Sequence, residues 1–164
     1  MEQLDLFKCK EPEREAQPQE WKIVAVRECP TPEEMQCCDT PQKAADYWRL
    51  HIEGAQSFDP ERESFVVIVL NAKLKIRCHH VVSVGTLNEC LVHPREVFRL
   101  PIMCAAFAIV LMHNHPSGES APSDADRKMT RRLREVAEIH GISLMDHVIV
   151  GRERHFSFKE CGLL

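Results

Sequence analysis

The sequence predicts an α/β domain in which helices flank a β-sheet. Two short runs, Phe65–Leu70 and Ala106–Met112, are continuously apolar and partly β-branched, which is typical of strands buried on both faces. The segment Asp124–His140 instead repeats its apolar residues at helical spacing, and one face gathers Met129, Leu133, Val136, Ala137 and His140. Buried strands that alternate with helical segments are the pattern of an α/β fold.

Length and composition bound the class of protein. A chain of 164 residues has room for one domain with its own core. Its net charge of -4 gives no overall attraction to nucleic acid or to an acidic membrane. No apolar run is long enough to span a bilayer, and Met1–Phe7 has neither the basic start nor the apolar core of a signal peptide. We therefore expect a cytoplasmic protein with no membrane partner.

The first elements are predicted from composition and from cap residues. Residues 1–20 are polar and rich in Glu, Gln and Pro, as in a flexible leader, and Trp21–Arg27 alternates like an edge strand. Thr40 before Pro41 is typical of a capped helix start, and helical spacing continues to about Ile52. The folded domain is therefore expected to begin near residue 40.

The central elements follow the first buried strand. Asn71–Leu74 resembles a hairpin turn that leads into a second strand, Ile76–Val84. Arg95–Leu100 begins a helix that Pro101 should end or kink unless it is only two turns long, because proline has no backbone N–H.

The C-terminal elements begin with the long helix. Ser123 is placed to cap its start, and Gly141 supplies its stop. Two strands, Leu144–Val150 and His155–Phe158, then close the domain.

The eight cysteines do not form a metal framework in the sequence. None belongs to a Cys-x-x-Cys pair, the spacing used by many structural zinc sites. In a cytoplasmic chain we expect most thiols to stay reduced, with Cys78, Cys90 and Cys104 at least partly buried. The adjacent Cys37 and Cys38 are the pair to watch for oxidation.

The residues with the clearest chemistry follow the strand Ala106–Met112. His113 and His115 stand two apart, so on an extended chain they face the same way and can share one metal ion. Asp126 can complete a set of three ligands if the intervening turn folds the chain back. Three ligands leave a fourth tetrahedral position for water, as in a catalytic zinc site. A commonplace alternative is that Ser123 and Asp126 form a capping box, and the two interpretations are compatible.

The same segment carries a family resemblance. The string His113-Asn114-His115-Pro116-Ser117-Gly118, followed by Pro122-Ser123 and Asp126, resembles the metal motif of the JAMM/MPN metalloproteases, in particular the RadC-type subfamily. The stretches 84–88, 92–98 and 146–151 are similar as well. The resemblance covers about residues 40–164 and leaves 1–39 as an N-terminal extension. The chain thus looks like a short form without the helix-hairpin-helix domain of longer RadC-type proteins.

The resemblance implies a fold and a set of ligands. The fold is an α/β domain with a mixed, curved sheet flanked by helices, layered like the cytidine deaminases. The metal is one Zn²⁺ per chain, held by His113, His115 and Asp126. Ser123 falls on the serine of the motif, and its implied role is to donate a hydrogen bond to the developing oxyanion.

The resemblance also implies a general base outside the metal's ligand shell. The family places a glutamate just ahead of the first core strand, and Glu63 occupies that position. On the residues alone, Glu63 is better explained as a solvated charge. Glu61 and Glu96 are the alternatives for the base.

The function implied by the resemblance is zinc-dependent hydrolysis of a peptide or isopeptide bond. The protein or peptide substrate is not identified by the sequence, and neither is an oligomeric state. The alternative is a DNA-associated repair or accessory factor, or a zinc-dependent nuclease, since RadC-type proteins are commonly labelled as DNA repair factors. This alternative would use the basic start of the long helix, formed by Arg127, Lys128, Arg131, Arg132 and Arg134. A solvated helix face explains those charges more simply, because no aromatic residues are interleaved to stack bases.

The other polar residues near the motif receive ordinary interpretations. Asn114 should point away from the ligands on an extended strand, with local hydrogen bonding as its task. The remaining histidines have no partner at ligand spacing and are predicted not to bind metal: His51, His79, His80, His93, His140, His147 and His155.

Overall fold

A computed structural model describes residues 36–85 and 92–164. Its elements in chain order are α1 (Pro41–Trp48), η1 (a π-helical turn, Arg49–Glu53), β1 (Ser64–Leu70), β2 (Ile76–Val84), α2 (Pro94–Met103), β3 (Ala108–Asn114), α3 (Asp124–Ile139), β4 (Ser143–Val150) and β5 (His155–Ser157). The predicted leader 1–20 and edge strand Trp21–Arg27 lie outside the described residues, as does Cys90.

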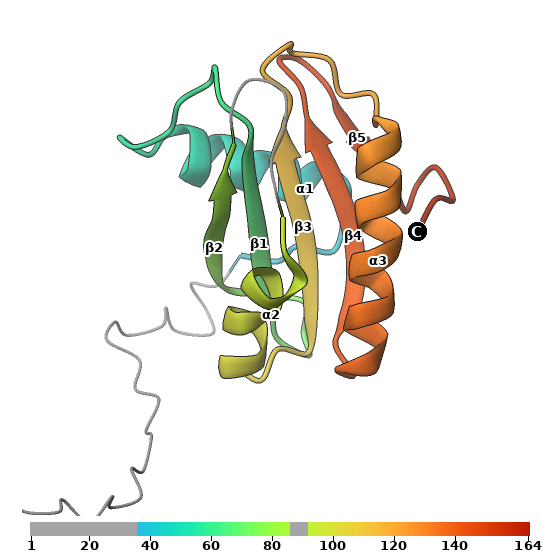
Figure 1. Cartoon of the computed structure of the whole chain (residues 1–164). Helices are drawn as coiled ribbons and strands as arrows, with labels where there is room; N and C mark the ends of the chain where they lie inside the picture. The colour runs from blue at the N-terminus through green and yellow to red at the C-terminus, as the bar shows by residue number, and fades with distance from the viewer. Residues whose placement is uncertain (1–35, 86–91) are drawn as a thin grey trace, which may run out of the picture.

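The strands form one mixed sheet in the order β2-β1-β3-β4-β5 (Figure 1). Its single parallel pair is β3 with β4, and the other neighbours are antiparallel. The parallel pair is joined by α3, which is the usual crossover between parallel strands. The predicted α/β fold with a mixed sheet flanked by helices is confirmed.

Helices cover both faces of the sheet, so β1 and β3 are buried along their whole length. On one face, α1 packs Ala44 and Trp48 against Val66, Ile68 and the neighbouring strands. On the other face, α2 and α3 pack against alternate strand residues, including Phe65, Val67, Ile109 and Leu111. This two-sided burial is why both strands consist of continuous apolar runs rather than alternating ones.

The predicted capped helix start at Thr40 is present. The Thr40 side chain caps α1 by accepting a hydrogen bond from the Lys43 N–H at 3.3 Å, and Pro41 occupies the first helical position. The helix then passes into η1, which ends at Gly54. The hairpin turn is also present, since the Leu74 N–H donates to the Asn71 carbonyl at 2.9 Å.

Two expectations for the region before β3 are wrong. Pro101 does not end α2, which continues to Met103. Pro101 has no N–H to donate to the preceding turn, and the helix ends two residues later. Phe107 does not belong to the buried strand and is 51% exposed. Its backbone extends the sheet ladder by bonding Leu70 and Ser143, which places no demand on its side chain.

The long helix α3 has an unusual buried row. The predicted apolar positions Leu133 and Ala137 are buried, whereas His140 is exposed as the C-cap. The same row continues towards the helix start with two polar residues, Asp126 and Thr130. Polar side chains in an otherwise core-facing row need partners, and here they point to a site.

The helices that the structure describes can be compared with the length and hydropathy of a membrane span. None of them is both long enough and apolar enough to cross a bilayer.

Candidate metal centre

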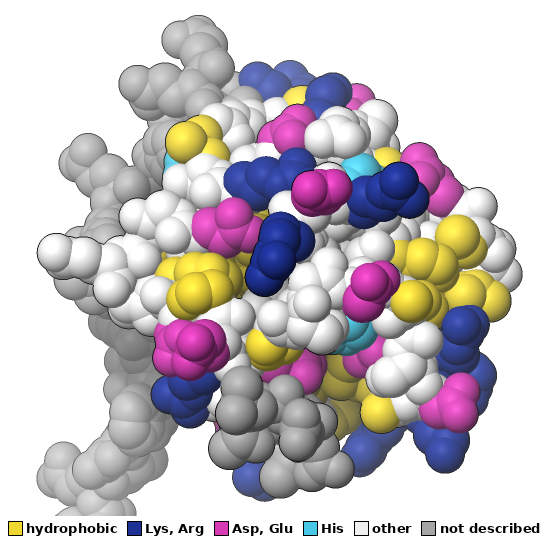
Figure 2. Space-filling view, turned by 90° about the horizontal axis from the view of Figure 1, so that it is seen from above, with side chains coloured by type: hydrophobic (Ala, Val, Ile, Leu, Met, Phe, Trp, Pro, Cys, Tyr) yellow, Lys and Arg dark blue, Asp and Glu magenta, His cyan; other side chains and the backbone are white. Residues whose placement is uncertain are grey.

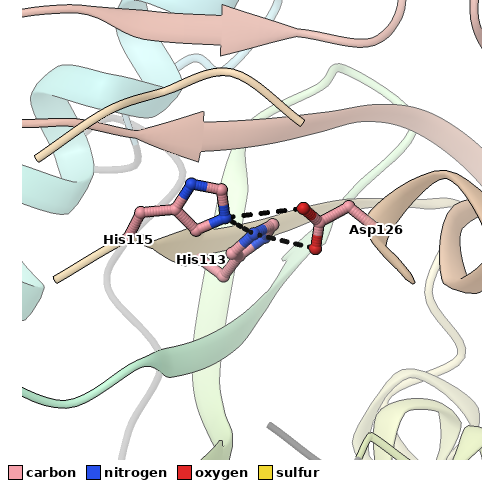
Figure 3. A group of neighbouring side chains, drawn as sticks. All are labelled: His113, His115 and Asp126. Atoms are coloured by element: carbon pink, nitrogen blue, oxygen red, sulfur yellow. Dashed lines mark hydrogen bonds and ion pairs between the residues drawn. The ribbon is translucent and has the colours of Figure 1, made fainter. Parts of the chain in front are cut away.

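Three side chains converge where β3 ends and α3 begins (Figure 3). The Nε2 atoms of His113 and His115 are 3.0 Å apart. Asp126 places Oδ1 at 3.2 Å from His113 Nε2 and Oδ2 at 3.4 Å from His115 Nε2. His113 and Asp126 are buried, and His115 is partly accessible. The predicted ligand set is therefore brought together at one point.

The spacing and chemistry of these atoms suit a metal ion. A tetrahedral zinc with bonds of about 2.0–2.1 Å holds its ligand atoms about 3.3 Å apart. The three separations above are close to that value. Imidazole nitrogen and carboxylate oxygen are both ordinary ligands of divalent transition metals. The residues present thus fit a metal held by His113, His115 and Asp126.

His115 is oriented by the turn that follows it. Its Nδ1 lies 2.8 Å from the Glu119 carbonyl, which can only accept, so Nδ1 carries a hydrogen and the neutral ring keeps its lone pair on Nε2. The turn closes through Gly118, whose φ of 82° favours glycine and whose N–H bonds the His115 carbonyl at 2.9 Å. Gly151 lets this turn pack closely, because a Cβ there would lie 2.5 Å from the Gly118 carbonyl.

Asp126 and Ser123 form the capping box that the sequence also allowed. The Ser123 N–H donates to Asp126 Oδ2 at 2.7 Å, and the Asp126 N–H donates to Ser123 Oγ at 3.1 Å. The Ser123 hydroxyl donates to Asp126 Oδ2 at 2.6 Å. Burial acts to raise the pKa of Asp126, but the imidazoles of His113 and His115 overcome it and hold that pKa well below its usual range. Asp126 is therefore both a member of the capping box and a candidate metal ligand.

The sequence did not predict the buried hydrogen bonds that support His113. His147 was predicted to be an ordinary polar residue, yet its Nε2 lies 2.9 Å from His113 Nδ1. Its Nδ1 lies 2.6 Å from Thr130 Oγ1. The ring is fully buried, and burial lowers the pKa of His147 well below its ordinary value. His147 is not part of the convergent set, so it supports a ligand rather than acting as one.

Asn114 performs the local hydrogen bonding that was predicted for it. Its Oδ1 accepts from the Ser64 N–H at 2.8 Å, and its Nδ2 donates to the Arg62 carbonyl at 3.0 Å. These two backbone groups flank Glu63. The antiparallel pairing of Phe65 with His113 already aligns the start of β1 with the end of β3, and Asn114 fixes the segment just before β1.

The three candidate bases have different surroundings. Glu63 is half-buried, and its carboxylate interacts electrostatically with His113, Asp126 and His115. Burial raises the pKa of Glu63, while His113 opposes that shift. Glu61 is exposed, and Glu96 lies on α2, where Arg95 at 3.4 Å and Arg99 at 3.2 Å pair with it. Of these residues, Glu63 has the surroundings that suit a base at the centre.

A groove of about 680 Å³ lies beside the accessible ligand His115. Its walls come from the segment before β1, the turn after β3 and the end of β4: Glu53, Phe58, Pro60, Glu61, Asn114, Pro116, Gly118, Val150, Gly151 and Arg152. Figure 2 looks down on this end of the molecule and shows basic and acidic side chains interspersed there. The groove has both apolar and charged walls.

Comparisons with known proteins agree with the geometry. The chain is 47% identical over 106 residues to a UPF0758 protein of Trichlorobacter lovleyi, 48% over 104 residues to one of Thermotoga maritima, and 47% over 124 residues to one of Desulforudis audaxviator. These matches cover 65%, 63% and 76% of this chain and 46%, 47% and 52% of the relatives. The chain thus spans about half the length of the curated relatives it matches. Residues 38–163 match the RadC-like JAB domain, and the chain belongs to that family.

Proposed function

We propose that this chain is a zinc-dependent hydrolase that cleaves a peptide or isopeptide bond. The observation that carries the proposal is the convergence of two imidazole Nε2 atoms and one carboxylate within 3.0–3.4 Å of one another. A second observation supports it. His115 bonds a backbone carbonyl through Nδ1, as metal-binding histidines usually do with the ring nitrogen that does not face the metal. Three protein ligands leave room for water in a tetrahedral site, as catalytic zinc sites do.

The chemistry divides between the metal and Glu63. Zinc supplies a lowered pKa for a coordinated water and polarisation of the scissile carbonyl. Glu63 takes the proton of the attacking water and returns it to the departing amine. Its raised pKa favours this role, because a base whose pKa approaches the working pH both accepts and releases the proton. Asn114 holds Glu63 in place through the peptide groups on either side of it.

Ser123 serves the substrate's oxyanion in this proposal. In the described structure its hydroxyl proton is given to Asp126 Oδ2 at 2.6 Å. With Asp126 holding the metal, its carboxylate would be a poorer acceptor, and the Ser123 hydroxyl would turn towards the substrate. A single oxyanion donor of this kind is worth about 3 kcal/mol in the barrier.

A polypeptide is the substrate class that the groove favours. It runs beside His115 and is lined by apolar residues, such as Phe58 and Val150, together with Glu61 and Arg152. Mixed walls of this sort accommodate a chain segment that has both apolar and charged side chains. The substrate itself is a protein or peptide that remains to be found by screening.

The test combines metal analysis with a cleavage screen. Purified protein is expected to contain one zinc per chain and to cleave a member of a peptide and isopeptide library. Glu63→Gln should keep the zinc and lose cleavage by a factor of about 10²–10⁴, whereas Glu96→Gln, on α2, serves as a matched control that keeps both. Absence of stoichiometric zinc would refute the proposal. Unchanged cleavage by Glu63→Gln would reassign the base.

Nucleic-acid binding is the competing outcome of the same work. Lys128, Arg131 and Arg132 lie exposed on α3, but Arg134 is paired with Glu138 at 3.1 Å. Electrostatic binding to DNA weakens steeply as salt rises. A protein that holds zinc, cleaves no amide in the screen and binds DNA with that salt dependence would favour the accessory-factor alternative.

A further inference from the structure

A continuous chain of hydrogen bonds runs behind the metal centre, from α3 through β4 to β3. The Thr130 hydroxyl lies 2.6 Å from the Asp126 backbone carbonyl and 2.6 Å from His147 Nδ1. His147 Nε2 in turn lies 2.9 Å from His113 Nδ1. Every member is buried and has at most 5% of its surface exposed. The chain therefore links one ligand residue, Asp126, to another, His113, by a route that avoids the metal position.

The direction of each bond follows from the single hydrogen that each donor has. A backbone carbonyl only accepts, so Thr130 must donate its one hydroxyl hydrogen to the Asp126 carbonyl. Thr130 Oγ1 can then only accept from His147, which places a hydrogen on His147 Nδ1. With its one hydrogen on Nδ1, the neutral ring of His147 has only an acceptor at Nε2. His113 must therefore donate through Nδ1.

We propose that Thr130 and His147 are positioning residues that fix the tautomer of His113, so that its Nε2 lone pair is presented to the metal. This inference rests on the proposed metal centre. It explains why the Nε2 lone pair of His113 is available to a metal ion. Without the relay, a neutral imidazole can place its hydrogen on either nitrogen. The Nε2–H form has no lone pair on the atom that faces Asp126 and His115.

The surroundings of His147 hold its ring in the orientation that the relay needs. Phe158 stacks on it with a centroid distance of 4.8 Å and an interplanar angle of 12°. Phe65 meets it edge to face at 5.7 Å and also stacks on His113 at 6.0 Å. Aromatic packing thus holds the rings of His113 and His147 in place. The positions of their ring hydrogens are then determined by the hydrogen bonds that begin at Thr130.

His113 and His115 are both assigned a hydrogen on Nδ1, but different groups determine it. His115 is oriented by the backbone carbonyl of Glu119, which no substitution of that side chain removes. His113 depends on two side chains instead. A substitution in the relay should therefore affect His113 and leave His115 unchanged, and this difference supplies an internal control.

The experiment measures tautomers directly in metal-free protein at pH 8. Nitrogen-15 NMR of the imidazoles is expected to show Nδ1–H for His113, His115 and His147 in the native chain. Thr130→Val, which keeps the side-chain shape but removes the hydroxyl, should increase the Nε2–H forms of His147 and His113 but not that of His115. Thr130→Ser should restore the native pattern. Finding His113 as Nε2–H in the native chain would overturn the relay, whatever the metal does.

Zinc affinity gives a second readout, measured by competition with a chromophoric chelator. We expect Thr130→Val and His147→Phe each to weaken zinc binding by about 10- to 100-fold, as loss of a supporting hydrogen bond to a ligand does. Phe98→Leu, a change in the same core but away from the centre, should lower the melting temperature without this loss. If Thr130→Val and Thr130→Ser bind zinc equally, the inference is wrong.

The two proposals fail in distinguishable ways. A native chain that binds no zinc but shows the expected tautomers would refute the metal-dependent function and retain the relay. A native chain that binds one zinc with the opposite tautomer of His113 would do the reverse. The Thr130 pair also keeps the test decisive if His147→Phe does not fold.

Discussion

Two buried polar clusters occupy opposite faces of β4, at neighbouring positions in the sequence. His147 faces α3 and supports the metal centre, whereas Asp146 faces α1 and joins the chain around β5. Asp146 Oδ1 accepts from the N–H groups of His147 at 2.7 Å and Lys159 at 3.0 Å. Its Oδ2 accepts from the Ser157 hydroxyl at 2.6 Å. Asp146 and His147 are both buried, so burial does not distinguish a site from a structural contact.

The difference lies in how acceptors are matched to donors. Around Asp146, both carboxylate oxygens receive hydrogen atoms from the chain itself. At the candidate metal centre, two Nε2 atoms and Asp126 Oδ1 face one another. For neutral imidazoles, the Glu119 carbonyl and the proposed relay place the hydrogens of His115 and His113 on Nδ1, so a cation would satisfy the three facing atoms. This pattern of unmatched lone pairs marks the centre as a site.

The largest effect is expected from removing the carboxylate of the metal centre. Asp126→Ala should weaken zinc binding by at least about 100-fold, because it removes one of three ligands and the only charged one. Zinc at 100 times its Kd should stabilise the native protein by about 2.7 kcal/mol, and EDTA should reverse this. Thermal unfolding with and without EDTA measures both. Asp124→Ala, at an exposed carboxylate in the same helix turn, should keep the full zinc-dependent shift.

The structural cluster should show the opposite profile. Asp146→Ala leaves three donors without their acceptor and should destabilise the fold by about 3 kcal/mol. Zinc affinity of the folded fraction should change by no more than about threefold, because no ligand is touched. Urea unfolding and chelator competition provide the two measurements. A matching loss of zinc affinity would show that the two clusters are coupled through β4, and the contrast would then need revision.

A substitution of Asn114 should have an effect of intermediate size, because Asn114 belongs neither to the candidate ligand set nor to the Asp146 cluster. Asn114→Ala removes both hydrogen bonds that hold the peptide groups flanking Glu63. We expect cleavage to fall by about tenfold through misplacement of Glu63, while zinc content stays at one per chain. Steady-state kinetics beside metal analysis separates these effects. Loss of zinc in this variant would instead assign Asn114 to the metal centre.

The smallest effect concerns Cys38, which lines a cavity with Asp146 on the α1 side. Burial raises the pKa of the Cys38 thiol to about 12, so at pH 8 it stays protonated and its thiolate fraction is tiny. In the native protein, iodoacetamide should label the exposed Cys161 first and leave Cys38 largely unmodified. Labelling of Cys38 should increase as pH rises towards 12, and peptide mapping by mass spectrometry follows it. Rapid labelling of Cys38 at pH 8 would contradict its buried, protonated state.

Local patterns predicted the elements and the convergent ligands well. The spacing of His113 and His115, and the helix start at Ser123, depend on neighbours in the chain, and these are what a sequence displays. The contact between His113 and His147 depends instead on the parallel pairing of β3 with β4, which no local pattern encodes. One signal was available. Asp126 and Thr130 stand four apart in the row that Leu133 and Ala137 continue, and two polar residues in a core-facing row indicate buried partners.

Pro101 and Glu63 show two further limits of the sequence. Pro101 lies inside α2, two residues before its end, so the proline did not mark the boundary of the helix. Glu63 resembles a surface charge among its neighbours, and its nearness to the centre arises from the antiparallel pairing of β1 with β3. Its use as a base could be suggested only by the family pattern.

The β3-α3-β4 crossover contains the three convergent residues and both members of the relay within residues 113–147. The residues of the proposed metal centre thus lie in one uninterrupted segment, whereas Glu63, the proposed base, lies just before β1 and outside that segment. A designer could transplant that crossover to another parallel strand pair and obtain a metal receptor without its proton acceptor. Under the proposed function, metal binding and turnover could be inherited, lost or redesigned separately, because their residues lie in different segments of the chain.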